Sequence, residues 1–309
     1  MAKIKKLLAA LLLCCMVGNL SGFASAYSES ESAPETIPST ELQPSETGPK
    51  LVHSYDVSEY DVYLDLKKKD TKALLEDGYT RQEVSALQEN KVEKELFARA
   101  QLSEVELRDF CYTAEQIEIL KAYDGSPLED NPQMRAVLAT FTGSIYTESV
   151  YSSSATMIFN WSWSSIPIVC LPLVKDYAVC TFKGTNRNNI PVQMRLASSS
   201  CVVSYYNGSS YSYQESVSIA DYDRFGYCKY NINQNDGSGK WAKIGSLTVQ
   251  VREEATTGTL YSTMFDFTFA HTELAINGGV SVGKSGADWG VDIGFGVNEL
   301  YHNDRTVHH

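Results

Sequence analysis

Residues 204–213, SYYNGSSYSY, bring aromatic rings and hydroxyl groups together around an Asn-Gly turn signal. Turns of two and of four residues both give a register that places Tyr206, Tyr211 and Tyr213 on one face of a hairpin. Tyrosines presented in this way stack on sugars or grip a peptide at a modest entropic cost. These three tyrosines are the candidate ligand-binding residues, with a glycan or an extracellular protein as partner. Cross-strand aromatic packing is the alternative.

Residues 279–283, GVSVG, match the G-x-S-x-G pattern of a catalytic serine. Asp288 or Asp292, followed by His302, would complete the order of serine, acid and histidine. A catalytic serine in this pattern stands on a strained turn between a strand and a helix. The residues around Ser281 instead continue an alternating strand. We therefore assign no catalytic residue. Glycoside hydrolysis needs only two suitably separated carboxylates, so a hydrolase without a recognisable motif is one alternative function.

Residues 231–239, NINQNDGSG, carry short side chains with oxygen atoms, as calcium loops do. An EF-hand beginning at Asn231 would need glycine at its sixth position and an acid at its twelfth, but Asp236 and Ala242 stand there. A hairpin turn around Asp236-Gly237 is the better interpretation. No metal or other cofactor is predicted, and calcium binding by a different arrangement is the alternative.

Five cysteines follow the N-terminal region: Cys111, Cys170, Cys180, Cys201 and Cys228. An odd number leaves one thiol over in any framework of disulfides. Cys170 with Cys180, or Cys201 with Cys228, are candidate pairs if strands bring them close, and buried free thiols are the alternative. Because the sequence has no C-x-x-C pair, a structural zinc site is not predicted.

The N-terminal residues have the order of a secretory signal peptide. Lys3, Lys5 and Lys6 precede an apolar run at 7–17, and small residues at 24–26 precede the expected cleavage point. The run is shorter than the roughly 18–20 apolar residues that span a bilayer. We therefore expect a signal peptide at 1–26 and a secreted or cell-surface-associated protein that has no stable transmembrane anchor.

The remaining chain is acidic. Removal of the three leader lysines takes the formal charge from −12 to −15. Such a charge repels phosphate backbones, so nucleic acid is not an expected partner. Residues 27–50 consist mostly of Ser, Glu, Thr and Pro, which predicts a disordered acidic linker.

Residues 51–134 are predicted to be a helical region. Helix starts commonly show a Ser or Thr cap with Glu or Gln three residues later. This pattern occurs three times, at Thr80 with Glu83, Ser103 with Glu106, and Thr113 with Gln116. Apolar residues between 84 and 120 recur at helical intervals. The similarity of GYTRQEVSAL, residues 78–87, to CYTAEQIEIL, residues 111–120, therefore reflects the chemistry of helix starts and not a duplicated ligand site.

Two resemblances involve the same residues. LLEDGYTRQEVSAL, residues 74–87, resembles the helix–Gly-aromatic–helix turn of ubiquitin-associated domains, but this covers only 14 residues and the capping pattern accounts for it. The exported leader, the GYT helices, YDGSP at 123–127 and the Tyr/Ser-rich C-terminal part together resemble uncharacterised secreted proteins of Gram-positive gut bacteria. Neither resemblance implies an activity for this chain.

Residues 135–309 are predicted to be a β-sandwich, which makes the fold class α+β. Charged residues become sparse, and apolar and polar side chains alternate. The clearest alternation lies at 137–146, 157–164, 247–252, 265–269 and 291–297. About ten antiparallel strands with one apolar face each suit two packed sheets, and a partly closed barrel is the alternative. Trp161 and Trp163 are expected in the core, and His271 is expected to be a packing residue.

The predicted function is a secreted or cell-surface-associated, non-enzymatic binding protein that recognises a glycan or protein through its β-loops. Loops at the ends of a sandwich commonly carry binding residues. A membrane-active, pore-forming toxin is the alternative from another class, because residues 277–298 suit a hairpin with one apolar face. Each arm of that hairpin is shorter than the roughly 9–11 residues of a spanning strand.

Overall fold

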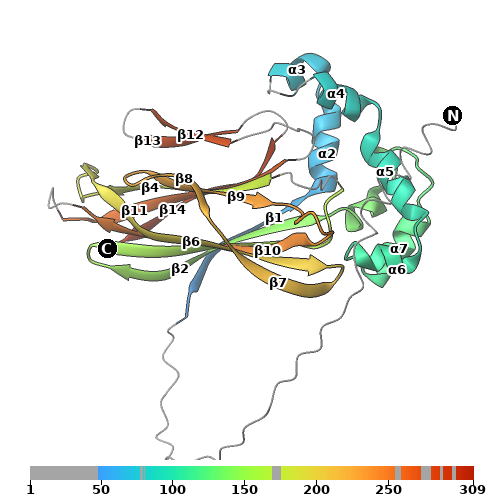
Figure 1. Ribbon diagram of the computed structural model, residues 1–309. Coiled ribbons are helices and arrows are strands. Elements are labelled where there is room, and N and C mark those ends of the chain that lie inside the picture. The colour runs from blue at the N-terminus through green and yellow to red at the C-terminus, as the bar shows by residue number, and fades with distance from the viewer. Residues whose placement is uncertain are drawn as a thin grey trace, which may run out of the picture. The chain divides into compact units, whose positions relative to one another are not determined.

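The alternating segments form two antiparallel sheets in the computed structural model (Figure 1). It describes residues 48–76, 79, 81–168, 175–254, 259–272, 280–285, 288–293 and 297–309. The expected signal peptide and the linker up to residue 47 lie outside these residues.

The first sheet, sheet A, has six strands. In spatial order they are β1 (Lys50–Ser58), β2 (Thr140–Tyr151), β3 (Ser154–Trp163), β10 (Trp241–Glu253), β6 (Met194–Asn207) and β7 (Ser210–Val217). The second sheet, sheet B, follows the order β14 (Val297–His308), β11 (Ser262–Thr272), β4 (Lys175–Thr185), β9 (Tyr227–Asn233) and β8 (Ile219–Asp223), with β5 (Pro191–Val192) paired to β4. A separate hairpin joins β12 (Val280–Ser285) to β13 (Asp288–Ile293).

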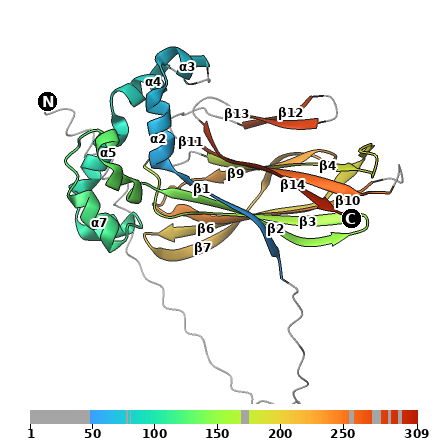
Figure 2. The same ribbon diagram turned by 180° about the vertical axis from the view of Figure 1, so that it is seen from behind.

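Sheets A and B pack face to face through aromatic side chains. Phe141 of β2 stacks on Phe269 of β11 with ring centroids 4.6 Å apart, and Phe159 of β3 lies 5.7 Å from Phe267 of β11. Trp161 is also buried in this core, 5.2 Å from Phe269. Both views show two layers (Figures 1 and 2). The sandwich is therefore confirmed, and the alternative of a partly closed barrel is wrong because the two sheets keep separate edges.

The helices gather at one end of the sandwich (Figures 1 and 2). They are α2 (Glu59–Lys68), α3 (Thr71–Glu76), α4 (Arg81–Gln88), α5 (Lys91–Ala100), α6 (Glu104–Asp109) and α7 (Ala114–Lys121), followed by the 3-10 turns η1 (Leu128–Asp130) and η2 (Pro132–Ala136). Two predicted capping boxes are confirmed, Ser103 with Glu106 and Thr113 with Gln116. The third depends on Thr80, which lies outside the described residues.

Residues 51–58 were expected to belong to the helical region, but they form strand β1 together with Lys50, the last residue of the predicted linker. β1 pairs with β2 along most of its length, and Val57 of β1 lies opposite Phe141. Val57 also packs against the sandwich core. The open edge of β2 supplies backbone partners for this segment, so the tertiary context selects a strand.

Arg99 and Glu59 join the helices to the sandwich. The buried guanidinium of Arg99 donates to the carbonyl oxygens of Ile166, Pro167 and Ile168 at 3.0–3.3 Å, in the segment that follows β3. The Glu59 carboxylate accepts the backbone N–H of Ile168 at 3.0 Å and that of Ala139, before β2, at 2.9 Å. The helices are thus fixed to the segments next to β2 and β3 of sheet A. No helix among the described residues is long and apolar enough to cross a membrane.

Cys111, Cys180, Cys201 and Cys228 carry free, buried thiols. Cys180 and Cys228 lie opposite each other on β4 and β9, whereas Cys201 belongs to β6 in the other sheet. The buried-thiol alternative therefore holds for these residues, and the candidate Cys201–Cys228 disulfide is not formed. Cys170, and with it the other candidate pair, lies outside the described residues.

Candidate functional site

The outer face of sheet A carries two rows of mainly polar side chains that cross all six strands. Antiparallel register brings residues of neighbouring strands side by side on one face. One row runs Asp56, Thr142, Ser162, Ile244, Ser204, Gln214. The next row runs Ser54, Ser144, Asn160, Ser246, Val202, Ser216. Hydroxyl and amide groups thus lie next to one another although they come from distant parts of the sequence.

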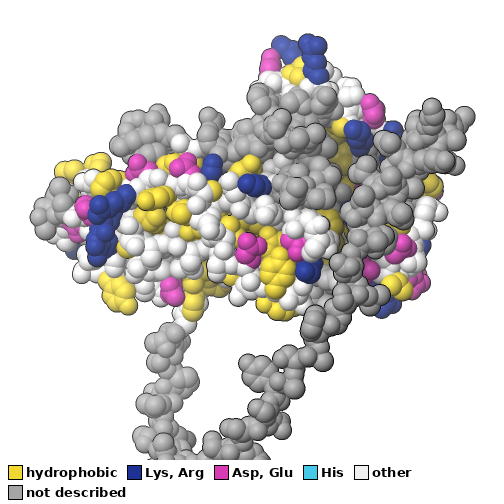
Figure 3. Space-filling model, in the orientation of Figure 1, with side chains coloured by type: hydrophobic (Ala, Val, Ile, Leu, Met, Phe, Trp, Pro, Cys, Tyr) yellow, Lys and Arg dark blue, Asp and Glu magenta, His cyan; other side chains and the backbone are white. Residues whose placement is uncertain are grey.

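A groove with a cavity volume of about 460 Å³ lies over these rows. Its lining residues are all uncharged: Thr142, Ser144, Tyr146, Asn160, Trp161, Ser162, Val202, Ser204, Gln214, Ile244, Gly245 and Ser246. Most present a hydroxyl or amide group, and hydroxyl and amide side chains can both donate and accept hydrogen bonds. On the side of the molecule that Figure 3 shows, dark blue and magenta side chains form small, separate groups on the sandwich.

Strand β1 pairs with β2, beside the groove lining, and its side chains contact two of the lining residues. The Oγ atoms of Ser54 and Ser144 are 2.9 Å apart. Thr142 Oγ1 donates to the Asp56 carboxylate at 2.6 Å. These contacts fix the rotamers of two lining hydroxyl groups, so the groove presents them in defined positions.

A β-bulge divides the three predicted tyrosines between two faces of the sheet. Tyr206 pairs with Tyr211, but its neighbour Tyr205 pairs with Tyr213, and the register shifts between the two pairs. Tyr206 and Tyr211 therefore share the outer face with the groove, in edge-to-face contact at 5.9 Å. Tyr213 stacks on buried Tyr205 at 5.0 Å and packs against the core. The expectation that all three share one face is thus wrong, because a bulge changes which residues lie opposite each other.

The hairpin tip between β6 and β7 packs on the helices. Cys111 Sγ donates to the carbonyl oxygen of Gly208 at 2.7 Å, and a side chain at Gly208 would press on the backbone of Asp109, the last residue of α6. Gly208 also has a positive φ of 57°, which glycine adopts at little cost. The tip is therefore held by the helical region, and Tyr206 is held with it.

The loop 231–239 is closed by its own hydrogen bonds. Asp236 accepts the backbone N–H groups of Ser238 at 2.7 Å and Lys240 at 3.1 Å, and Tyr213 donates to it at 3.1 Å. Burial opposes ionisation, but these hydrogen bonds together lower the pKa of Asp236. The carboxylate stabilises the turn around Gly237, which has an isolated antiparallel bridge between Asn235 and Trp241. The segment connects β9 of sheet B to β10 of sheet A, so these two strands do not form the predicted hairpin. Among the described residues, no group of acidic, His or Cys side chains has the arrangement of a metal site.

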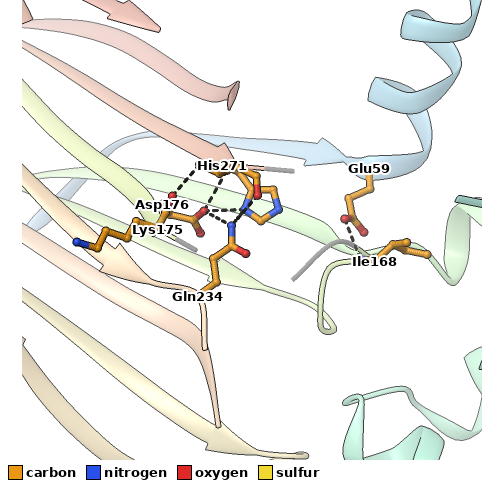
Figure 4. A network of polar contacts seen from close by, with 7 residues as sticks. Glu59, Ile168, Lys175, Asp176, Gln234 and His271 are labelled. Carbon is orange, nitrogen blue, oxygen red and sulfur yellow. Dashed lines mark hydrogen bonds and ion pairs between the residues drawn. The ribbon is translucent and has the colours of Figure 1, made fainter. Parts of the chain in front are cut away.

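A buried His–Asp pair lies in sheet B (Figure 4). Asp176 Oδ1 lies 2.8 Å from His271 Nδ1 and accepts Gln234 Nε2 at 2.6 Å. Gln234 also donates to the carbonyl oxygen of Thr272 at 2.8 Å. His271 is 1% exposed, with the Trp163 ring 4.9 Å away. A substrate would have no direct access to these groups, so their role is to tie β4, β11 and the end of β9 together.

The segment proposed as a pore hairpin packs on sheet B. Its arms β12 and β13 have six residues each, fewer than the roughly 9–11 of a membrane-spanning strand. Val282 of β12 packs against Tyr177, Val179 and Ala270 of sheet B. Ser281 pairs with Asp292 within this hairpin, so the GVSVG serine does not stand at a strand–turn–helix junction. This packing gives neither the toxin nor a serine-hydrolase alternative any support.

The sequence predicted the faces of several groove residues, but not that these residues come together in one groove. Alternation correctly placed Thr142 and Ser144 on one face of β2, and Asn160 and Ser162 on one face of β3. It gave no sign that β10 lies between β3 and β6, because strands far apart in sequence pair in sheet A. It also missed Gln214, which reaches the groove only through the pairing of β7 with β6.

The chain matches no family model and no curated protein sequence. One match among solved structures is a chain from the complete structure of manganese lipoxygenase of Gaeumannomyces graminis and partial structure of zonadhesin of Komagataella pastoris. The sequences are 8% identical, and the match covers 53% of this chain and 47% of that chain, with a TM-score of 0.22. This chain therefore matches about half the length of the other, and a TM-score this low carries no argument about fold or activity.

Proposed function

We propose that the protein binds a neutral glycan on the outer face of sheet A. The observation that carries the proposal is the groove, whose uncharged lining places hydroxyl and amide groups in adjacent cross-strand rows. A neutral sugar presents many hydroxyl groups that both donate and accept hydrogen bonds, which is the chemistry that Ser, Thr, Asn and Gln side chains match. The binding site is then a sheet face, and not the β-loops that the sequence suggested.

The groove favours a glycan over a protein partner. Protein interfaces centre on a few large aromatic or Arg side chains in a desolvated patch, whereas this groove is lined mainly by short polar ones. Its uncharged lining also offers no counterion to a phosphate or sulfate group. A neutral carbohydrate thus satisfies the lining groups without an unpaired charge.

We place this function outside the cell, as a secreted or cell-surface-associated binding protein. The order of basic, apolar and small residues at 1–26 supports export. An exported protein would meet polysaccharides outside the cell, where the groove could bind them.

The test compares retention of the protein on neutral polysaccharide gels before and after a change in the groove. Asn160→Ala removes the amide at the centre of the second row, and we expect it to lose about 1–3 kcal/mol of binding free energy, because sugar groups are left unpaired. Gln250→Ala is the matched control, since Gln250 lies on β10 outside the groove lining. Affinity electrophoresis against glucans, mannans and xylans measures both variants.

Equal retention of the Asn160→Ala variant and the unchanged protein would contradict the proposed site. Failure of the unchanged protein to bind any neutral polysaccharide would contradict the proposed function itself.

A further inference from the structure

We infer that the ligand is an extended oligosaccharide chain that lies across the strands of sheet A, with its end stacked on an aromatic platform formed by Tyr206, Tyr211 and Trp241. This inference rests on the proposed glycan-binding function and goes further in specifying the length and position of the ligand. It also assigns Trp241, which no sequence motif indicated, to the site.

The width of the groove supports a chain and not a single sugar. The lining residues come from five adjacent strands, β2, β3, β10, β6 and β7. Neighbouring strands lie about 4.8 Å apart, so the groove crosses about 19 Å of sheet. That distance is several times the width of one hexose ring, and each strand along it contributes a polar side chain to one row, except for Ile244 in β10.

The platform continues the groove at the β10–β6–β7 corner. Tyr206 pairs with Trp241 on one side and with Tyr211 on the other, so these three residues form a third cross-strand row. Tyr206 is two residues beyond Ser204 on the same strand, which places it on the same face at a distance of about 7 Å along the strand. Ser204 and its neighbours Gln214 and Ile244 all line the groove. A ligand that leaves the groove here meets aromatic rings next.

The exposure of these rings suits stacking. Tyr211 is 60% exposed, and Tyr206 and Trp241 are partly exposed. The ammonium group of Lys243 lies 5.4 Å from the centroid of the Tyr206 ring. The ring of Tyr206 is also in edge-to-face contact with Tyr211. Rings held in this way lose little side-chain entropy when a sugar stacks on them.

The experiment measures dissociation constants for neutral oligosaccharides of one to six sugars, prepared from each polysaccharide that the full chain binds. We expect affinity to rise by about tenfold or more between the disaccharide and the longest members, and tenfold corresponds to about 1.4 kcal/mol. Tyr211→Ala and Tyr206→Ala should each lower the affinity for the longest members by about threefold or more, because each removes one aromatic contact. The affinity for short oligosaccharides, which the groove holds without the platform, should stay within about twofold.

Tyr222→Ala is the matched control, because Tyr222 is 57% exposed but belongs to β8 in sheet B. It should leave the dependence on chain length unchanged. Tyr211 is largely exposed, so its replacement by alanine should not disturb folding. Unchanged denaturant midpoints confirm that the variants fold.

The outcomes separate this inference from the proposed function. Binding that is independent of chain length, or a length dependence that both tyrosine variants leave unchanged, would overturn the inference while the groove remains the binding site. Absence of binding to every neutral oligosaccharide and polysaccharide would overturn both. Stronger binding to acidic than to neutral oligosaccharides of equal length would also overturn the inference.

Discussion

The buried cysteines show how position within the fold decides the chemistry of a residue. Cys180, Cys201 and Cys228 lie in the core between the sheets and are at most 1% exposed. Burial raises the pKa of each thiol, to about 12 for Cys201 and for Cys228. Because the thiolate is the reactive form, these residues are inert components of the core in the folded protein.

We therefore predict that Cys180, Cys201 and Cys228 resist alkylation at pH 8 until the protein unfolds. An unfolded thiol has a pKa of about 8.5, below the folded value. The resulting stabilisation is fully present below that pH and is lost as pH rises toward 12. Urea unfolding at pH 7.5 and pH 10.5 measures the loss. Cys201→Val should show a smaller loss between the two values, and an equal loss would contradict this account.

The buried polar residues were harder to predict. His271 was expected to be a packing residue, and its burial against Trp163 agrees with that. Its partner Asp176 lies 95 residues earlier, so only the pairing of β4 with β11 brings the two together. Local sequence patterns do not indicate a contact between residues this far apart. The capping residue Thr113 and its partner Gln116, in contrast, are three positions apart and could be identified directly.

At the scale of elements, sequence pattern predicted the strand faces better than the strand partners. Alternation identified the apolar face of β3, including Trp161, because the side-chain period of a strand is two. The bulge between Tyr205 and Tyr206 changed the register locally, and this separated Tyr213 from Tyr206. A bulge adds one residue to one strand of a pair, so its position depends on both strands and is not evident from either alone.

The packing of β3 on β10 yields a prediction at this scale. Trp161 lies opposite Gly245, and a Cβ at Gly245 would overlap the indole ring. We expect Gly245→Ala to lower the free energy of unfolding by about 1–3 kcal/mol, as overpacking of a core does. Ser246→Ala, one residue further along β10 and on the outer face, is the control and should change stability by less than about 0.5 kcal/mol.

Denaturant titration followed by tryptophan fluorescence measures both variants. A Gly245→Ala protein as stable as the unchanged protein would show that the indole has room to move, and the packing described for Trp161 would then be wrong.

At the scale of the whole molecule, the fold class and its division into helical and β parts were predictable, but the groove was not. Helical spacing and alternation are local signals, and they separated α2–α7 from the strands that follow. The groove depends on the order β2-β3-β10-β6-β7, in which β3 and β10 are neighbours although about 80 residues separate them. That order follows from the packing of the entire core, which no single segment specifies.

The helices contribute to the site from a distance. Arg99 and Glu59 fix them to the segments beside β2 and β3. Cys111 holds the hairpin tip that carries Tyr206 and Tyr211. The two halves of residues 50–309 thus act together, with the sheet supplying the groove and the helical region holding its aromatic end.

The most direct test of the account is nuclear magnetic resonance of the side-chain amides during titration with a neutral oligosaccharide that the protein retains. The account predicts that the amide resonances of Asn160 and Gln214 shift in proportion to occupancy, while that of Gln250, outside the groove on the same sheet, does not. Binding that leaves Asn160 and Gln214 unchanged and shifts resonances of the helical region or sheet B instead would contradict it.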